Sequence, residues 1–160
     1  MILSILAISR LREKYWQDAA ADYIRRLQPY ARLEIIEIPE ARIAASASHA
    51  EEAKAMDQEG RAILERLEKH SGPVVVLDRL GKALDSMELA AWLHGQALQG
   101  RGNIAWVIGG PLGLSPPVLE RADIVLSFSR MTFPHQMMRL ILLEQIYRSF
   151  RIIKNEPYHK

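Results

Sequence analysis

The segment N-E-P-Y-H-K places three chemically capable side chains in succession: Tyr158, His159 and Lys160. A tyrosine ring can stack on a nucleic-acid base, an imidazole can move a proton near neutral pH, and an ammonium group can contact a phosphate. Terminal segments are ordinarily poorly ordered and inert. The local sequence therefore leaves two interpretations open, an inert tail and a group of side chains that handles a base.

Three glycines lie within five positions of the run I-G-G-P-L-G-L-S, residues 108–115. Glycine tolerates positive φ and lets other atoms approach the backbone, so the cluster indicates a tight turn, a close ligand, or both. The run lacks the Gly-Lys-Ser/Thr of a P-loop and the spacing of a dinucleotide-binding fingerprint. It therefore favours a loop whose backbone faces a planar base, although a purely structural strand-to-helix turn fits equally well.

Basic side chains are concentrated late in the chain. Residues 128–160 carry six Lys or Arg against two Glu, a net charge of +4 in a chain whose total is +2. Arg139, Arg148 and Arg151 could frame a surface near one helix end. Such asymmetry is used in nucleic-acid binding, although a solvated helix face more commonly causes it.

No metal chemistry is indicated. The chain has no cysteine, which excludes disulfides, thiolate metal sites and a cysteine nucleophile. His135 follows Pro134 at a predicted helix start, where capping or packing is a more common role than catalysis. The remaining histidines lack the spacing of metal ligands. We therefore expect no metal site.

Strands and helices alternate along the chain. Apolar runs rich in β-branched residues predict strands at Ile2–Ile8, Leu33–Ile38, Val74–Leu77, Ile104–Ile108 and Ile124–Phe128. Helical periodicity predicts helices at Trp16–Leu27, about Glu51–Lys69, from the Asp85–Glu88 capping box to about Leu98, after an N-cap at Ser115, and at His135–Phe150. This alternation predicts one α/β domain over residues 1–160 with a largely parallel sheet.

Ligands of open α/β sheets bind beyond the carboxyl ends of the strands. The segments 77–82, 108–115 and 127–135 should therefore meet at one edge. The helix 135–150 is apolar around most of its circumference, which favours packing against a second subunit over a wholly intramolecular position. No segment approaches the roughly 20 apolar residues of a membrane span, and the first residues lack a signal-peptide pattern, so we expect a cytoplasmic protein.

Three motifs carry a family resemblance: I-G-G-P-L-G-L-S, L-S-F-S-R-M-T-F-P-H-Q-M-M-R and L-L-E-Q-I-Y-R-S-F-R-I-I-K-N-E-P-Y-H-K. They closely resemble the bacterial family of large-subunit ribosomal RNA methyltransferases that modify N3 of a pseudouridine, within the SPOUT class. The resemblance implies a SPOUT-type parallel sheet flanked by helices with a C-terminal deep trefoil knot. It also implies a homodimer that acts on 23S rRNA in the assembled ribosome, in the stem-loop that bridges to the small subunit.

The resemblance further implies a bound S-adenosyl-L-methionine, held by three converging loops. Carried over by position, its binding residues are Leu77, Gly109, Phe128, Ser129, Arg130, Met131, Thr132 and Phe133. The family often has a polar residue where this chain has Leu112, and an arginine where it has Lys160.

Pseudouridine N3 must lose a proton to attack the methyl group. We expect His159 to accept that proton and Tyr158 to orient the base, with Lys160 and Arg139 contacting phosphate or stabilising the developing charge. Two other functions stay open: a non-catalytic ribosome-binding factor with the same basic segment, and a nucleotide-binding protein whose glycine loop holds phosphate.

Overall fold

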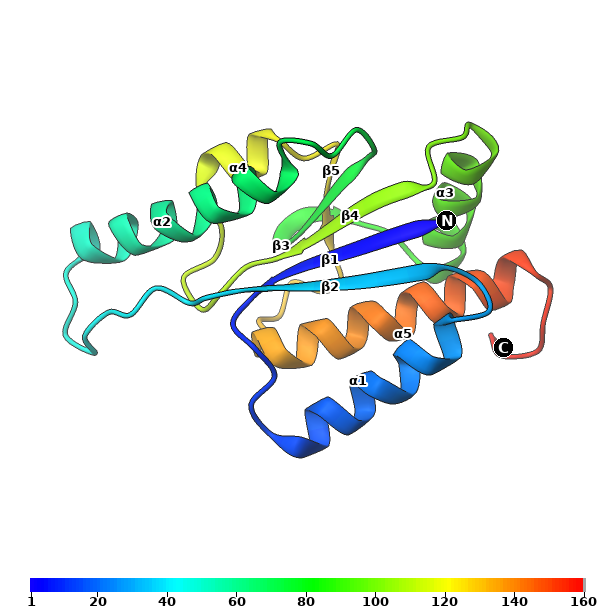
Figure 1. The fold of residues 1–160 in the computed structure, drawn as a ribbon, viewed down its shortest axis with the longest axis horizontal. Coiled ribbons are helices and arrows are strands. Elements are labelled where there is room, and N and C mark those ends of the chain that lie inside the picture. Colours follow the sequence, from blue (N-terminus) through cyan, green and yellow to red (C-terminus); the bar gives the residue numbers. More distant parts are fainter. Residues whose placement is uncertain (160) are drawn as a thin grey trace.

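The computed structural model describes residues 1–159. Five parallel strands form one sheet in the order β2-β1-β4-β3-β5 (Figure 1). The strands are β1 Ile2–Ile8, β2 Arg32–Ile38, β3 Val74–Ala83, β4 Asn103–Ile108 and β5 Ile124–Ser127. The helices are α1 Lys14–Leu27, α2 His49–Leu67, α3 Ser86–Leu98, α4 Pro116–Glu120 and α5 His135–Ile153. The predicted α/β architecture with a parallel sheet is confirmed, whereas the knot stays a prediction.

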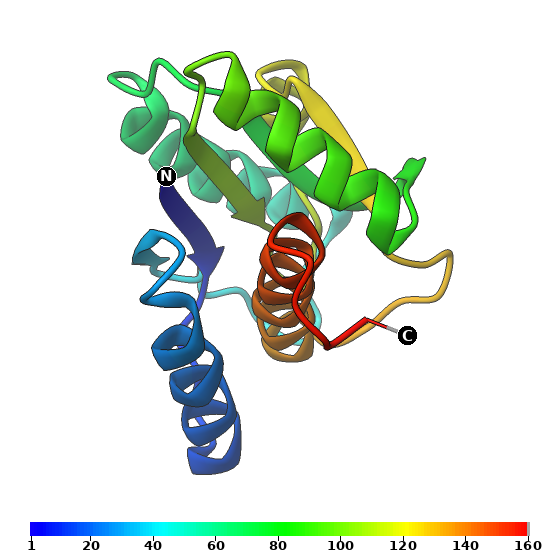
Figure 2. The ribbon, with the colours of Figure 1, turned by 90° about the vertical axis from the view of Figure 1, so that its right-hand side faces the viewer.

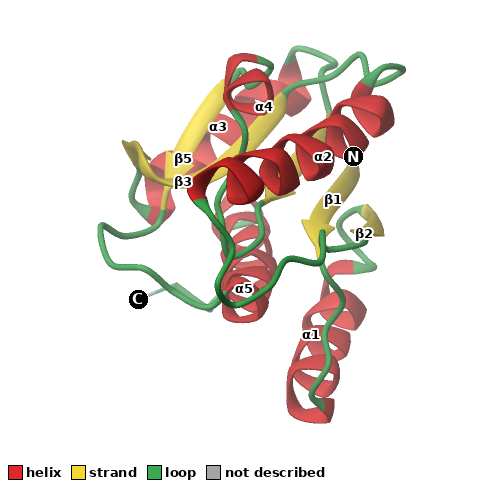
Figure 3. Ribbon diagram, turned by 90° about the vertical axis from the view of Figure 1, so that its left-hand side faces the viewer, coloured by secondary structure: helices red, strands yellow, loops and turns green. Residues whose placement is uncertain are grey.

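Helices cover both faces of the sheet because its strands are apolar on both sides. Residues such as Leu3, Val75 and Trp106 pack against α1, α3 and α5. Their sequence neighbours, such as Val74 and Val107, pack against α2 and α4 on the opposite face. Successive strand side chains point to opposite faces, so one apolar run supplies two cores. Figures 2 and 3 show the two helical layers.

Several element boundaries differ from the sequence prediction. Strand β3 continues past Leu77 through a polar run to Ala83, with a shift in its register against β5. A Cβ at Gly81 would lie 2.5 Å from the carbonyl oxygen of Val125, so glycine permits this close approach. Helix α2 begins at His49 because Ser48 and Glu51 form a capping box. Helix α5 extends to Ile153.

Helix α5 lies between α1 and α3 against the sheet (Figure 2). Each of its residues is buried or partly buried within this one chain. Tyr147, for example, meets the rings of Tyr23 and Tyr30 at 6.1 Å each. Intramolecular packing therefore accounts for most of the apolar circumference that favoured a dimer, and the homodimer stays a prediction. None of the helices in residues 1–159 has both the length and the apolar character needed to cross a membrane.

Candidate functional site

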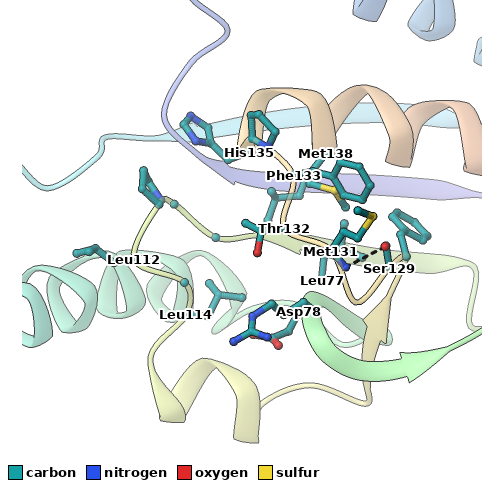
Figure 4. Close-up of a pocket in the computed structure, with 18 of the residues that line it drawn as sticks. Leu77, Asp78, Leu112, Leu114, Ser129, Met131, Thr132, Phe133, His135 and Met138 are labelled. Atoms are coloured by element: carbon teal, nitrogen blue, oxygen red, sulfur yellow. Dashed lines mark hydrogen bonds between the residues drawn. The ribbon is translucent and has the colours of Figure 1, made fainter.

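A cavity of about 700 Å³ opens at the carboxyl edge of the sheet (Figure 4). Three segments enclose it: residues 77–79 of β3, the glycine loop after β4, and the segment that leads from β5 into α5. These are the segments that the sequence predicted to converge. Seven of the eight predicted cofactor-binding residues line the cavity, namely Leu77, Gly109, Phe128, Ser129, Met131, Thr132 and Phe133. Arg130 is exposed and is not part of the lining.

The chain's own turn explains all three glycines of the loop. The Gly113 N–H donates to the Gly110 carbonyl over 3.0 Å, and Gly113 has a φ of +87°, a conformation that disfavours other residues. A Cβ at Gly110 would lie 3.0 Å from the Ile8 side chain, and one at Gly109 would lie 2.8 Å from that of Leu114. Glycine is thus required by packing inside the loop rather than by a ligand alone.

Hydrogen bonds also fix the segment after β5. The Ser127 hydroxyl lies 3.1 Å from the Arg79 carbonyl oxygen and 3.0 Å from that of Ser129. The Met131 N–H in turn donates to Ser129 Oγ over 3.0 Å, as drawn in Figure 4. These bonds tie two walls of the cavity together, since Arg79 belongs to β3. The cavity walls therefore have a defined shape before any ligand binds.

The sequence prediction missed other lining residues. Apolar side chains add to the lining at Leu112, Leu114 and Met138, and polar ones at Asp78 and Arg79. The stretch L-D-R-L-G-K pointed to the last two, since it was expected at the same edge. The lining thus combines apolar side chains with exposed loop backbone, an arrangement that suits a planar ring with a short apolar chain.

His135 lines the cavity at the first turn of α5. Its Nε2 is buried and has no hydrogen-bond partner within residues 1–159. Burial lowers the pKa of His135, and this effect outweighs the nearby Glu40 carboxylate, which raises it. The imidazole is therefore neutral at pH 7. It is packed rather than capping, because the N-cap of α5 is Pro134.

Tyr158 docks on the middle of α5. Its hydroxyl donates to Glu144 Oε1 over 3.1 Å, and its ring meets that of Tyr147 edge-on at 5.0 Å. The Arg148 guanidinium lies 4.8 Å from the ring centroid. Burial, together with hydrogen bonding and the Glu144 carboxylate, raises the pKa of Tyr158 well above its ordinary value. The phenol therefore keeps its proton at neutral pH and serves as a donor.

Glu144 and Arg148 organise this tail cluster, which consists of Glu144, Arg148, Tyr158 and His159. Arg148 forms an ion pair with Glu144 at 2.6 Å, four residues apart on the helix. Its Nη1 also lies 3.4 Å from Nδ1 of the exposed His159. A guanidinium can only donate, so a hydrogen bond here requires Nδ1 as the acceptor, with the ring proton on Nε2. The sequence prediction named Arg148 only as one of several basic residues.

Arg139 does not reach the surface. It is 2% exposed, and it donates to Glu37 over 2.5 Å and to the Ser9 carbonyl oxygen over 2.6 Å. The sequence analysis grouped Arg139 with the tail, as a contact to phosphate or to the developing charge. The structure instead buries Arg139 apart from Tyr158 and His159. It pairs this side chain with the exposed Glu37 and the buried Ser9. Lys160, the remaining predicted catalytic residue, lies outside the described residues.

The cavity and the tail cluster are separate within one chain. The last residue of α5 in the cavity wall is Met138, and Glu144 follows six residues later. At 1.5 Å per residue this separates them by about 9 Å along the helix axis. Within residues 1–159, no group of three or more His, Asp or Glu side chains is placed to hold a metal ion.

Comparison with known proteins relates the whole described chain to one family. The family model described as "Predicted SPOUT methyltransferase" matches residues 1–159. A protein of Symbiobacterium thermophilum named "Ribosomal RNA large subunit methyltransferase H" is 50% identical over 161 residues and covers all of both chains. The protein of the same name from Alkaliphilus oremlandii is 51% identical over 160 residues, again with complete coverage.

A solved structure supports the fold. The crystal structure of a probable methyltransferase from Bordetella pertussis Tohama I aligns with 92% of this chain and 95% of its own, with a TM-score of 0.55. Its sequence identity is 14%, so the likeness concerns the fold alone.

Proposed function

Since the chain belongs to the SPOUT methyltransferase family, with close relatives named ribosomal RNA large subunit methyltransferase H, we propose that it methylates N3 of a pseudouridine in 23S rRNA. The proposed methyl donor is S-adenosyl-L-methionine, and the proposed substrate is the assembled ribosome. The observation that carries this proposal is the cavity enclosed by three segments. Its lining contains seven of the eight residues expected to hold the donor.

The cavity fits this donor in size and chemistry. Its volume of about 700 Å³ lies within the range of small-molecule sites. Leu77, Leu114 and Phe128 would pack against the adenine ring, and loop backbone at Gly109 would meet its polar edge. Met131 and Thr132 would close the outer side. When bound, the sulfonium supplies an electrophilic methyl group.

The tail cluster would handle the base. Tyr158 keeps its proton and donates it to Glu144, so it would help to orient the pseudouridine by holding the tail in place rather than by acting as a base. His159 is the proposed acceptor of the N3 proton. Its Nδ1 faces Arg148, so the ring must turn away from Arg148 before it can accept that proton. Lys160 would add positive charge beside the base.

We propose that two copies of the chain complete one site. The tail cluster of one copy begins about 9 Å along α5 from the wall of its own cavity, and methyl transfer requires the base to touch the donor. A homodimer in which the tail of one copy faces the cavity of the other would join the two halves. One subunit would then hold the donor while its partner helps to position the ribosome.

Transfer of labelled methyl from S-adenosyl-L-methionine to assembled ribosomes lacking the modification tests this function. Free large subunits and ribosomes without the pseudouridine are the controls. Label on N3 in assembled ribosomes alone is the expected result. Donor binding without label on any substrate would instead support a non-catalytic ribosome-binding factor. Binding of ATP or NAD in place of the donor would support a nucleotide-binding protein.

A further inference from the structure

A second cavity lies at the same edge of the sheet, beyond the ends of β1 and β2. Its volume is about 770 Å³, and its walls are the loop after β1 and the loop after β2. Exposed arginines line it at Arg10, Arg12 and Arg42. Neither the family resemblance nor the proposed chemistry uses these residues.

The charges in this second cavity are unbalanced. Its two carboxylates already have partners, since Glu37 binds the buried Arg139 and Glu40 binds Arg12 at 3.4 Å. Neither Arg10 nor Arg42 forms an ion pair within residues 1–159. The charges left over are therefore two guanidiniums, which are suited to bind phosphate oxygens through paired hydrogen bonds.

The second cavity adjoins the first, which is the proposed site of the methyl donor and is called the donor cavity below. The Arg12 N–H donates to Gln136 at the start of α5 over 3.0 Å, next to His135 in the donor cavity wall. Gly110 of the glycine loop also packs against Ile8 at the end of β1. Figure 3 views this edge, where the loops after β1 and β2 lie beside the start of α5. An RNA strand whose base enters the donor cavity can thus place its phosphate backbone over the second cavity.

We infer that Arg10 and Arg42 bind the phosphate backbone of the RNA that flanks the target nucleotide, a step that rests on the proposed RNA substrate. Arg12 contributes to the same surface while it stays paired with Glu40. The surface supplies affinity and register, and it has no contact with the reacting atoms.

The test compares the Arg10→Ala/Arg42→Ala variant with a matched Arg32→Ala/Arg66→Ala control. The control removes the same charge from two exposed arginines at the amino edge, at the start of β2 and in the last turn of α2. Both variants are assayed for binding to assembled ribosomes at several salt concentrations, for donor binding, and for KM and kcat of methyl transfer. Inorganic pyrophosphate serves as the free-anion probe.

Loss of two phosphate contacts should lower the slope of log affinity against log salt by about 1.4–1.8, which is about 25- to 60-fold in affinity at 0.1 M salt. We expect this loss in the cavity variant only, with a raised KM, unchanged kcat and unchanged donor affinity. The inference would be overturned if the two variants lost ribosome affinity equally. It would also be overturned if pyrophosphate bound with micromolar affinity and ribosomes did not displace it. Ribosome binding is measured without turnover, so absence of methyl transfer tests the proposed function separately.

Discussion

Substitution of Tyr158 tests whether the docked tail is needed for turnover. Tyr158→Phe removes only the hydroxyl bond to Glu144, and bonds to an ionised acceptor contribute about 1.5–3 kcal/mol. The side chain is partly exposed, so we take the lower value, about 1.5 kcal/mol. The ratio of docked to undocked tail should then fall about tenfold.

Tyr158→Ala removes two further contacts. The edge-on ring pair with Tyr147 adds about 0.5–1.5 kcal/mol, and the Arg148 guanidinium over the ring adds about 0.5–1 kcal/mol. The total loss of about 2.5–4 kcal/mol corresponds to a shift on the order of 100-fold or more. Tail docking and kcat should therefore decrease from the native chain to the phenylalanine variant and again to the alanine variant.

Three measurements separate the possible outcomes. Hydrogen exchange over the tail reports docking, methyl transfer at saturating donor reports kcat, and donor titration reports the cavity. Donor affinity should not change, because no residue of the tail cluster lines the cavity. Tyr15→Phe, at an exposed tyrosine of α1, is the control. Full turnover with a released tail would refute the role of docking, and a loss of donor affinity would refute the separation of tail and cavity.

Further substitutions test the loop and two buried titratable groups. Gly109→Val should weaken donor binding more than tenfold, since its Cβ would meet Leu114 and displace the loop. Gly113→Ala should lower only the free energy of unfolding, by the strain of its positive φ, about 1–2 kcal/mol measured by chemical denaturation. Burial raises the pKa of Glu59, so ionisation of this carboxyl opposes folding. Glu59→Gln should therefore stabilise the chain at pH 7, and the difference in unfolding free energy between variant and native chain should vanish near pH 4. Burial lowers the pKa of His135, so native stability should decrease as the pH falls below about 6.5, and His135→Gln should lose that dependence in pH-resolved unfolding. An unchanged pH profile in either variant would contradict the burial argument.

Local patterns predicted the elements and the edge at which they meet. Continuous apolar runs identify strands that are covered on both faces, and parallel strands bring their following loops together. The donor cavity could therefore be predicted as a meeting of three segments. The polar continuation of β3 could not, because it depends on the fit of Gly81 against Val125 in another strand. Apolar periodicity carries no information about such a backbone contact.

Pairings between distant residues were also beyond sequence reasoning. Arg139 and Glu37 are 102 positions apart, and a charged residue is ordinarily expected at the surface. The contact of Tyr158 with Glu144 depends on a chain reversal after α5, which local propensity does not specify. The roles of the tail residues therefore stay predictions, while the anchors of Tyr158 and His159, Glu144 and Arg148, emerged only from the structure.

The buried Arg139 connects helix α5, which borders the donor cavity, to residues that line the second cavity. It joins the first turns of α5 to Ser9 at the end of β1 and to Glu37 at the end of β2. Ser9 has a φ of +68°, an unfavourable conformation for a residue other than glycine, and its carbonyl oxygen accepts from the Arg139 guanidinium. This bond offsets the backbone strain and holds the loop after β1 against α5. We therefore expect Arg139 to affect methyl transfer through the position of these loops rather than through contact with RNA.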